Sequence, residues 1–163
     1  MQIRRIAITG NMSGIGKCLY EKFYPYYECI GLDKENDNDI HDTRKVVDKC
    51  LSADVLINNA YAFNKQHELL YQWCSFSKDK PKLAISIGSV VTELGLFDHR
   101  LPSEKYYIEK MRLKKITYEV NGNGGKCKAS IISPGFVDTN IDMTFEQPTV
   151  VEKTARMWEI CKE

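Results

Sequence analysis

The 163-residue sequence lacks several features that would each indicate a class of protein. No apolar run approaches the length needed to span a bilayer. Charge of one sign is not in excess, because 23 basic and 22 acidic side chains leave a net charge of +1. The composition therefore gives no electrostatic reason to expect nucleic acid or an anionic membrane as a partner.

The amino terminus and the cysteines give no sign of a secreted protein. The segment MQIRRIAITG holds only a three-residue apolar run before Thr9, which is not the pattern of a secretory signal peptide. The six cysteines form no C-x-x-C pair, and the three histidines lie apart from one another. We therefore expect reduced thiols in a cytoplasmic protein, and no metal site.

Strand-like and helix-like segments alternate along the whole chain. The expected strands cover residues 3–10, 28–33, 53–60, 82–91 and 128–135, with a very short additional strand ending near Ile40. The expected helices cover residues 13–27, 42–51, 66–77 and 103–120, with one short helix in the tail from Pro148. This alternation predicts an α/β fold: one domain over 1–163, with a parallel sheet covered on both faces.

The segment ITGNMSGIGK joins the first strand to the first helix and places glycines at 10, 14 and 16. Glycines there remove side chains that would block a pyrophosphate, and the helix presents its N–H groups and positive dipole end to the anion. Asp33 ends the next strand, where its carboxylate would accept bonds from ribose hydroxyls and repel a 2′-phosphate. The pattern therefore predicts a dinucleotide site that prefers NAD to NADP, although Lys34 weakens the preference. The alternative is a plain strand–turn–helix.

Further motifs make the sequence resemble the short-chain dehydrogenases/reductases, in their compact form. After the glycine loop they follow in that family's order: Asp39-Ile40-His41-Asp42, Asn58-Asn59-Ala60, Ile87-Gly88-Ser89, Tyr106-x-x-x-Lys110 and Pro134-Gly135-Phe136-Val137-Asp138-Thr139. Tyr61 departs from the pattern, because it stands where a glycine is usual. The resemblance implies a doubly wound Rossmann-like sheet of about six strands in the order 3-2-1-4-5-6.

The resemblance also implies an NAD(H)-dependent oxidoreductase that interconverts a secondary alcohol and a carbonyl by hydride transfer. Tyr106 is the expected general acid/base, and Lys110 is expected to lower the tyrosine pKa and to bond the nicotinamide ribose. Ser89 would hold the substrate carbonyl. Spacing selects Tyr106 over Tyr107, because residues four apart adjoin on one helix face. Tyr107 is expected to be a packing or dimer-contact residue.

Asn64 is the candidate for the asparagine that, in this family, usually supports a water linked to the lysine. Its alternative is a role as N-cap of the helix over 66–77. By the same resemblance, Val137 would offer backbone groups to the carboxamide, and Thr139 would bond the phosphate or carboxamide. The full set of expected cofactor contacts is Gly10, Asn11, Met12, Ser13, Gly14, Ile15, Gly16, Asp33, Asp39, Ile40, Asn59, Ala60, Tyr106, Lys110, Pro134, Gly135, Val137 and Thr139.

The chain is much shorter than a usual member of that family. No seventh strand is visible, and the residues after Thr139 provide only a stub of the substrate-covering helices, so we expect an open site. We expect a homodimer built on the helices over 65–78 and 103–120. A second hypothesis is a catalytically weak dinucleotide-binding regulator or scaffold. The candidates for an apolar substrate pocket, each equally plausible as core, are Phe97, His99, Phe136, Met143 and Phe145.

Overall fold

The structure is a computed structural model, and it describes residues 2–94 and 104–135. Within these ranges five parallel strands form one sheet in the spatial order β2-β1-β3-β4-β5. The strands are β1 (Arg5–Thr9), β2 (Glu28–Leu32), β3 (Val55–Asn58), β4 (Leu83–Ile87) and β5 (Lys128–Ile132). The helices are α1 (Gly14–Phe23), the 3-10 turn η1 (Lys34–Asn36), α2 (Thr43–Cys50), α3 (Gln66–Phe76), α4 (Val91–Leu94) and α5 (Glu104–Gly122). The prediction of an α/β, Rossmann-like parallel sheet is confirmed.

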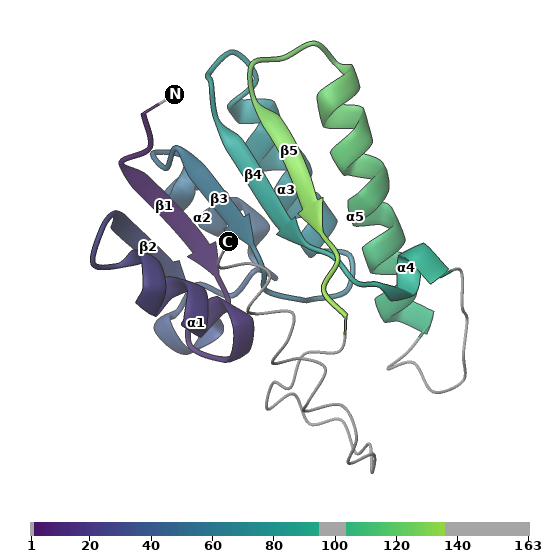
Figure 1. Cartoon of the computed structure of the whole chain (residues 1–163), viewed down its shortest axis with the longest axis horizontal. Helices are drawn as coiled ribbons and strands as arrows, with labels where there is room; N and C mark the ends of the chain where they lie inside the picture. Colours follow the sequence, from purple (N-terminus) through teal and green to yellow (C-terminus); the bar gives the residue numbers. More distant parts are fainter. Residues whose placement is uncertain (1, 95–103, 136–163) are drawn as a thin grey trace.

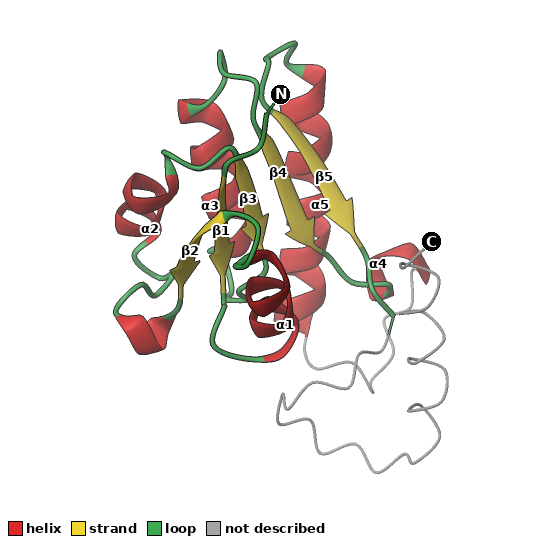
Figure 2. Ribbon diagram, turned by 60° about the vertical axis from the view of Figure 1, so that its left-hand side comes forward, coloured by secondary structure: helices red, strands yellow, loops and turns green. Residues whose placement is uncertain are grey.

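Successive strand residues point to opposite faces of the sheet, so apolar side chains lie on both faces. Helices cover each of these faces. Figures 1 and 2 show α1 on one face and α2, α3 and α5 on the other. The larger core lies under α2, α3 and α5, where three strands contribute Ala7, Ala84 and Ala129. These small side chains let the helices approach the sheet closely, around the fully buried ring of Trp73. The smaller core packs α1 against Ile6, Ile8, Val55 and Ile57.

The very short strand expected to end near Ile40 does not form, and this part of the prediction is wrong. Asp37 has a left-handed backbone (φ 60°), and the N–H of Asn38 donates back to the carbonyl of Asp33 at 2.8 Å. The segment is therefore folded into turns that use its backbone groups locally, and no strand pairs beyond β2 among the described residues. The remaining strands keep the expected order.

The carboxyl ends of the parallel strands lie together at one edge of the sheet (Figure 1). The chain leaves β1 toward β2 on one side, and β3 lies on the other side of β1. In open parallel sheets, ligands bind in the crevice outside such a point of reversal. The connections that follow β1, β2, β3 and β4 at this edge therefore define where a site is expected.

Several expectations fall outside the described residues. These are the helix in the tail from Pro148, the cofactor contacts Val137 and Thr139, and the pocket candidates Phe97, His99, Phe136, Met143 and Phe145. Over the ranges 2–94 and 104–135, no helix is long and apolar enough to cross a membrane. The same ranges contain no cluster of three or more metal-ligating side chains.

Candidate active site

The glycine loop forms one wall of a cavity of about 440 Å³ at the carboxyl ends of β1, β2 and β3. Gly10 has a left-handed backbone (φ 71°), and its N–H donates to the Leu32 carbonyl at 2.7 Å. A Cβ on Gly16 would lie 2.0 Å from the Gly10 carbonyl oxygen, so only glycine lets α1 begin this close to β1. The other expected contacts that line the cavity are Ser13, Gly14, Ile15, Asp33, Asp39, Ile40, Asn59 and Ala60.

Thr9 and Asn59 tie the glycine loop to the end of β3. The Thr9 hydroxyl accepts the backbone N–H groups of Asn59 at 2.9 Å and Ala60 at 3.0 Å. The Asn59 amide donates in return to the Thr9 carbonyl at 3.0 Å. Two strands that are distant in sequence therefore hold the cavity wall in one geometry before any ligand binds.

Asp33 lies at the end of β2 with its side chain in the cavity wall, and it is buried. Its carboxylate accepts the N–H of Met12 and the N–H of Glu35, each at 3.2 Å. The carboxylate thereby joins the glycine loop to η1, and it brings a negative charge to the rim of the cavity. Lys34 lines the same cavity next to it.

Asn11 follows Gly10 in the glycine loop but does not line the cavity. Its Oδ1 atom is buried and has no hydrogen-bond partner among the described residues. A Cβ on Gly31 would lie 2.4 Å from the Asn11 amide nitrogen, so the glycine in β2 makes the room in which Asn11 lies. The glycines, the Asp33 carboxylate and the cavity volume together fit the adenosine and phosphate part of a dinucleotide.

Ser89 and Tyr106 meet beyond β4. Ser89 follows the end of β4 and is 9% exposed, and its side chain is hydrogen-bonded to that of Tyr106, in the first turn of α5. Burial raises the pKa of the Tyr106 phenol, because the apolar surroundings disfavour the phenolate, while the bond with Ser89 acts in the opposite direction. Tyr107, one residue on, is half-buried.

Lys110 lies beneath the Tyr106 ring, with its ammonium 5.2 Å from the ring centroid. The ammonium donates to Gln66 Oε1 and to the Ile87 carbonyl oxygen, each at 2.7 Å. Burial lowers the pKa of Lys110 from 10.5 to about 8, and Glu109 opposes that shift. We expected Lys110 to lower the Tyr106 pKa, but in this geometry burial dominates and the pKa is raised.

Gln66 is a site residue that sequence reasoning missed. Its side chain is fully buried, and its amide nitrogen donates to the Asn58 carbonyl at 2.9 Å and the Ile87 carbonyl at 3.3 Å. The Asn58 amide donates in turn to the Gln66 carbonyl at 2.9 Å. The available signal was the spacing of Gln66 with Leu69, Leu70 and Trp73, which places a polar side chain on the buried face of α3.

Among the described residues no direct hydrogen bond joins the Asn64 side chain to Lys110, and this side chain does not cap α3. Asn64 has a left-handed backbone (φ 62°), and its side-chain oxygen accepts from Arg112. The start of α3 is instead capped by Glu109, which accepts the N–H of Asn64 and the N–H of His67, each at 2.9 Å. The cap therefore comes from α5, which is distant in sequence.

Tyr61 connects the two halves of the site. It lines the cavity of about 440 Å³, and its ring centroid lies 5.0 Å from that of Tyr106. The Lys110 ammonium is 5.8 Å from the Tyr61 ring. A second phenol thus lies where the family pattern has glycine, between the glycine loop and the Ser89–Tyr106 pair.

The expected cofactor contacts Pro134 and Gly135 follow the end of β5. The Pro134 carbonyl accepts the N–H of Val90, and Gly135 is half-buried.

Similar architectures occur among solved structures at low sequence identity. A short-chain dehydrogenase from Burkholderia cenocepacia J2315 in complex with NADP superposes with a TM-score of 0.68 and 15% identity, covering 100% of this chain and 86% of that one. The fold is that of the short-chain dehydrogenases/reductases.

Two further structures of this fold are similar to the chain. The bulky-bulky ketone specific alcohol dehydrogenase from Comamonas testosteroni has a TM-score of 0.64 and 17% identity, with coverage of 100% and 85% of the two chains. A short-chain dehydrogenase/reductase from Burkholderia phymatum in complex with NAD has a TM-score of 0.55 and 15% identity, with coverage of 97% and 79%. No family model matches the sequence, and no curated protein matches it.

Proposed function

We propose that the chain is a short-chain dehydrogenase/reductase that interconverts a secondary alcohol and a carbonyl by hydride transfer with a nicotinamide dinucleotide. One observation carries the proposal: a hydrogen-bonded serine–tyrosine pair with an ammonium under the tyrosine ring lies next to a cavity built by a glycine loop. Tyr61 borders both parts, so a dinucleotide that extends past Tyr61 would reach the pair. The dehydrogenases of the same fold in complex with NADP or NAD support this assignment.

A bound nicotinamide ring supplies or accepts the hydride, and the residues of the chain handle the proton. In carbonyl reduction the Tyr106 phenol donates its proton to the substrate oxygen, and in alcohol oxidation the phenolate takes it back. The Ser89 hydroxyl, already bonded to Tyr106, holds that oxygen in line with the phenol. Lys110 favours the phenolate electrostatically from beneath the ring.

The preferred dinucleotide in this proposal is NAD. The Asp33 carboxylate lies in the cavity wall and would accept bonds from ribose hydroxyls, whereas a 2′-phosphate there would place two negative charges in contact. Lys34 reduces that preference without reversing it.

The second candidate is a dinucleotide-binding regulator or scaffold with weak catalysis. The raised pKa of Tyr106 favours it, because a less acidic phenol is a poorer proton carrier at neutral pH. The two candidates differ in one observable. Tight NADH binding without turnover across a broad panel of ketones and alcohols identifies the regulator, and turnover identifies the enzyme.

The proposed assembly is a cytoplasmic homodimer that buries α3 and α5 against their copies. These helices carry the exposed side chains Tyr71, Phe76, Met111 and Tyr118, which are large and partly apolar. Exposed aromatic and methionine side chains are enriched in the centres of protein interfaces. Light scattering should give twice the mass of the chain, and a mass of one chain contradicts the dimer.

The enzymatic proposal is tested with Tyr106→Phe, which removes only the phenolic oxygen. With a substrate found in an NADH-consumption screen, the variant should lose about 100-fold or more in kcat while NADH affinity changes little. Tyr107→Phe is the matched control, because the neighbouring phenol has no part in the proposed chemistry. Equal turnover by Tyr106→Phe and the wild type would show that Tyr106 is not the general acid/base.

A further inference from the structure

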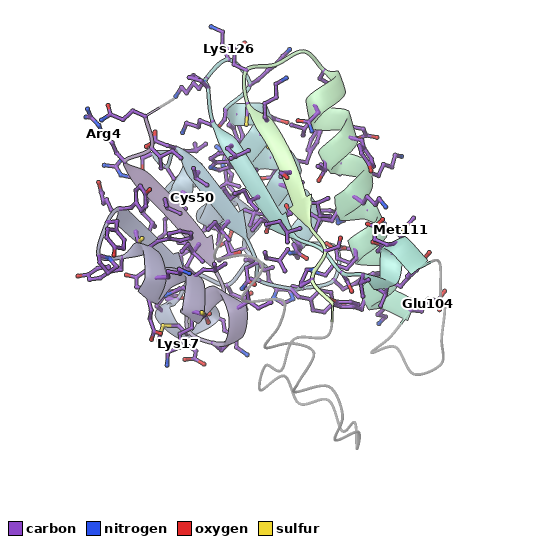
Figure 3. The ribbon with its side chains drawn as sticks, viewed as in Figure 1. Arg4, Lys17, Cys50, Glu104, Met111 and Lys126 are labelled. Carbon is purple, nitrogen blue, oxygen red and sulfur yellow. The ribbon has the colours of Figure 1, made fainter. Side chains whose placement is uncertain are left out.

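Tyr61 stands between the cavity and the proton-transfer pair, and the proposed reaction gives it no step of its own. Its side chain follows β3, lines the cavity of about 440 Å³ and is 44% exposed. Tyr106 lies in the first turn of α5. Figure 3 shows the start of that helix, at Glu104, at the same end of the molecule as Lys17 of α1. The Tyr61 ring therefore lies where the two halves of the site join.

The Tyr61 ring packs directly against the Tyr106 ring. The two ring centroids lie 5.0 Å apart, and the ring planes are inclined by 56°. The Lys110 ammonium lies over both rings, 5.8 Å from the Tyr61 centroid and 5.2 Å from that of Tyr106. Tyr106 is half-buried, so a neighbouring aromatic ring keeps water from one side of the phenol. Lost hydration disfavours the phenolate more than the neutral phenol.

The other groups in contact with Tyr106 do not reverse this effect. Burial is the largest influence on the Tyr106 pKa and raises it, while the hydrogen bond with Ser89 acts in the opposite direction. The Lys110 ammonium favours the phenolate, but with a pKa of about 8 it has lost most of its charge before an ordinary tyrosine, at 10.0, would ionise. The phenol is therefore the stable form around neutral pH.

The carboxylates that α4 and α5 bring to this region have partners of their own. Glu93 of α4 forms an ion pair with Lys114 at 2.8 Å. Glu109 of α5 accepts the N–H of His67 at 2.9 Å. The contact with Tyr61 is thus one whose removal changes the hydration of Tyr106 without removing a charge.

We propose that the Tyr61 ring covers Tyr106 and keeps the phenol protonated, so that the site reduces carbonyls at neutral pH and oxidises alcohols only at high pH. The inference rests on the proposed function. In reduction the carbonyl carbon gains a hydride from the reduced dinucleotide and its oxygen gains the Tyr106 proton, which solvent then returns to the phenolate. Oxidation needs the phenolate as base, the form that the cover disfavours. Tyr61 acts through Tyr106 and is a positioning residue.

The test is the ionisation of Tyr106, followed by NMR in the full chain with carbon-13 at Cζ of its tyrosines, without nucleotide or substrate. The signal is identified by its absence from Tyr106→Phe. In the unmutated chain the midpoint should lie above the ordinary tyrosine value of 10.0. In Tyr61→Gly it should fall by about one pH unit, because water reaches the phenol. Equal midpoints in the two proteins overturn the proposal.

Two further variants separate the cover from the aromatic character of the ring. Tyr61→Phe and Tyr61→Leu both keep an apolar side chain over Tyr106, so each should leave the midpoint within about 0.3 pH unit of the unmutated value. A fall in Tyr61→Leu as large as in Tyr61→Gly contradicts the cover. The unmutated chain is a test by itself if Tyr61→Gly does not fold, since a midpoint at or below 10.0 also overturns the proposal.

Turnover gives the functional readout, with a ketone and its alcohol found in the screen. Between pH 6.5 and 7.5 reduction should change little, whereas oxidation should rise about tenfold, because the phenolate fraction rises tenfold. In Tyr61→Gly oxidation at pH 7.5 should be about tenfold faster than in the unmutated chain, for a midpoint lowered by about one pH unit. Equal oxidation rates in the two proteins contradict the proposed bias. Failure of the proposed function is seen separately, as unchanged turnover in Tyr106→Phe, whereas the NMR midpoint tests the cover alone.

Discussion

Lys110 is a buried cation whose water has been replaced by two oxygen atoms of the chain. Its exposed fraction is 2%. The Gln66 amide oxygen and the Ile87 carbonyl oxygen each accept a hydrogen bond from the ammonium at 2.7 Å. The two bonds fix the ammonium beneath the Tyr106 ring but do not fully compensate for lost hydration. The pKa of Lys110 is therefore lowered to about 8, because the lost hydration is not fully replaced.

The stability of the protein should therefore depend on pH through Lys110. Its folded pKa of about 8 lies below the ordinary 10.5, so the unfolded chain binds more protons between these values and stability rises with pH. From pH 7 to 9.5 the free energy of unfolding should increase by about 2 kcal/mol from this group. The measurement is urea unfolding at both pH values, compared with Lys110→Met. A rise of equal size in that variant contradicts the assignment to Lys110.

Gln66 positions the lysine, and its loss should be visible in both stability and pH dependence. Gln66→Leu leaves the ammonium with one acceptor, the Ile87 carbonyl, and removes the amide that donates to the Asn58 carbonyl, which should lower the free energy of unfolding by about 2 to 4 kcal/mol. It should also shift the pH profile of turnover, because the Lys110 pKa falls further when an acceptor is lost. Gln72→Leu, which removes a bond to Glu68 on the same helix, is the control. An unchanged pH profile of turnover would show that Gln66 only packs in the core and does not influence the Lys110 pKa.

At the scale of elements, α5 organises the site from one face. The spacing of Tyr106, Glu109, Lys110 and Leu113 places a phenol, a carboxylate, an ammonium and a core side chain on the side toward α3 and the sheet. Glu109 is fully buried and holds the first N–H groups of α3, while Lys110 holds Gln66 in the first turn of the same helix. The two helices are thus joined by polar bonds at the active-site end.

Removing the cap supplied by α5 should destabilise the fold specifically. Glu109→Ala leaves the N–H groups of Asn64 and His67 without an acceptor, which should cost about 2 to 4 kcal/mol. The exposed Glu119→Ala on the same helix should change stability by less than about 0.5 kcal/mol. Thermal and urea unfolding compare the two variants. Similar small losses in both would show that α3 does not depend on this cap.

The parallel sheet and the glycine loop were predictable from sequence, whereas the polar network under the site was not. The short apolar runs that end at Gly10, Asp33 and Asn58 indicate three strands and the positions of their carboxyl ends, and they do so from the local sequence alone. The support of Lys110 by Gln66, and the cap of α3 by Glu109, depend on contacts between helices 42 or more residues apart. No local pattern reports such a contact, so Asn64 was chosen by distance in sequence. The strand expected near Ile40 failed because Asp37 and Asn38 prefer turns.

At the scale of the whole molecule, the two ends of the sheet carry different chemistry. The carboxyl edge holds the cavity of about 440 Å³, where Asp33 accepts the N–H of Met12 in the glycine loop. The opposite edge holds a smaller cavity of about 240 Å³ between α3, α5 and the turn that leads into β5.

The account depends most on dinucleotide binding at the carboxyl edge, and a fluorescence titration tests it without a substrate. NADH should bind the wild type more tightly than NADPH. Asp33→Ala should weaken NADH by about tenfold, or about 1.4 kcal/mol, while weakening NADPH less or improving it. Glu35→Ala, at the next acidic position of the cavity wall, is the matched control. Absence of saturable binding by either dinucleotide, or equal NADH affinity in the wild type and Asp33→Ala, would contradict the assignment of this cavity.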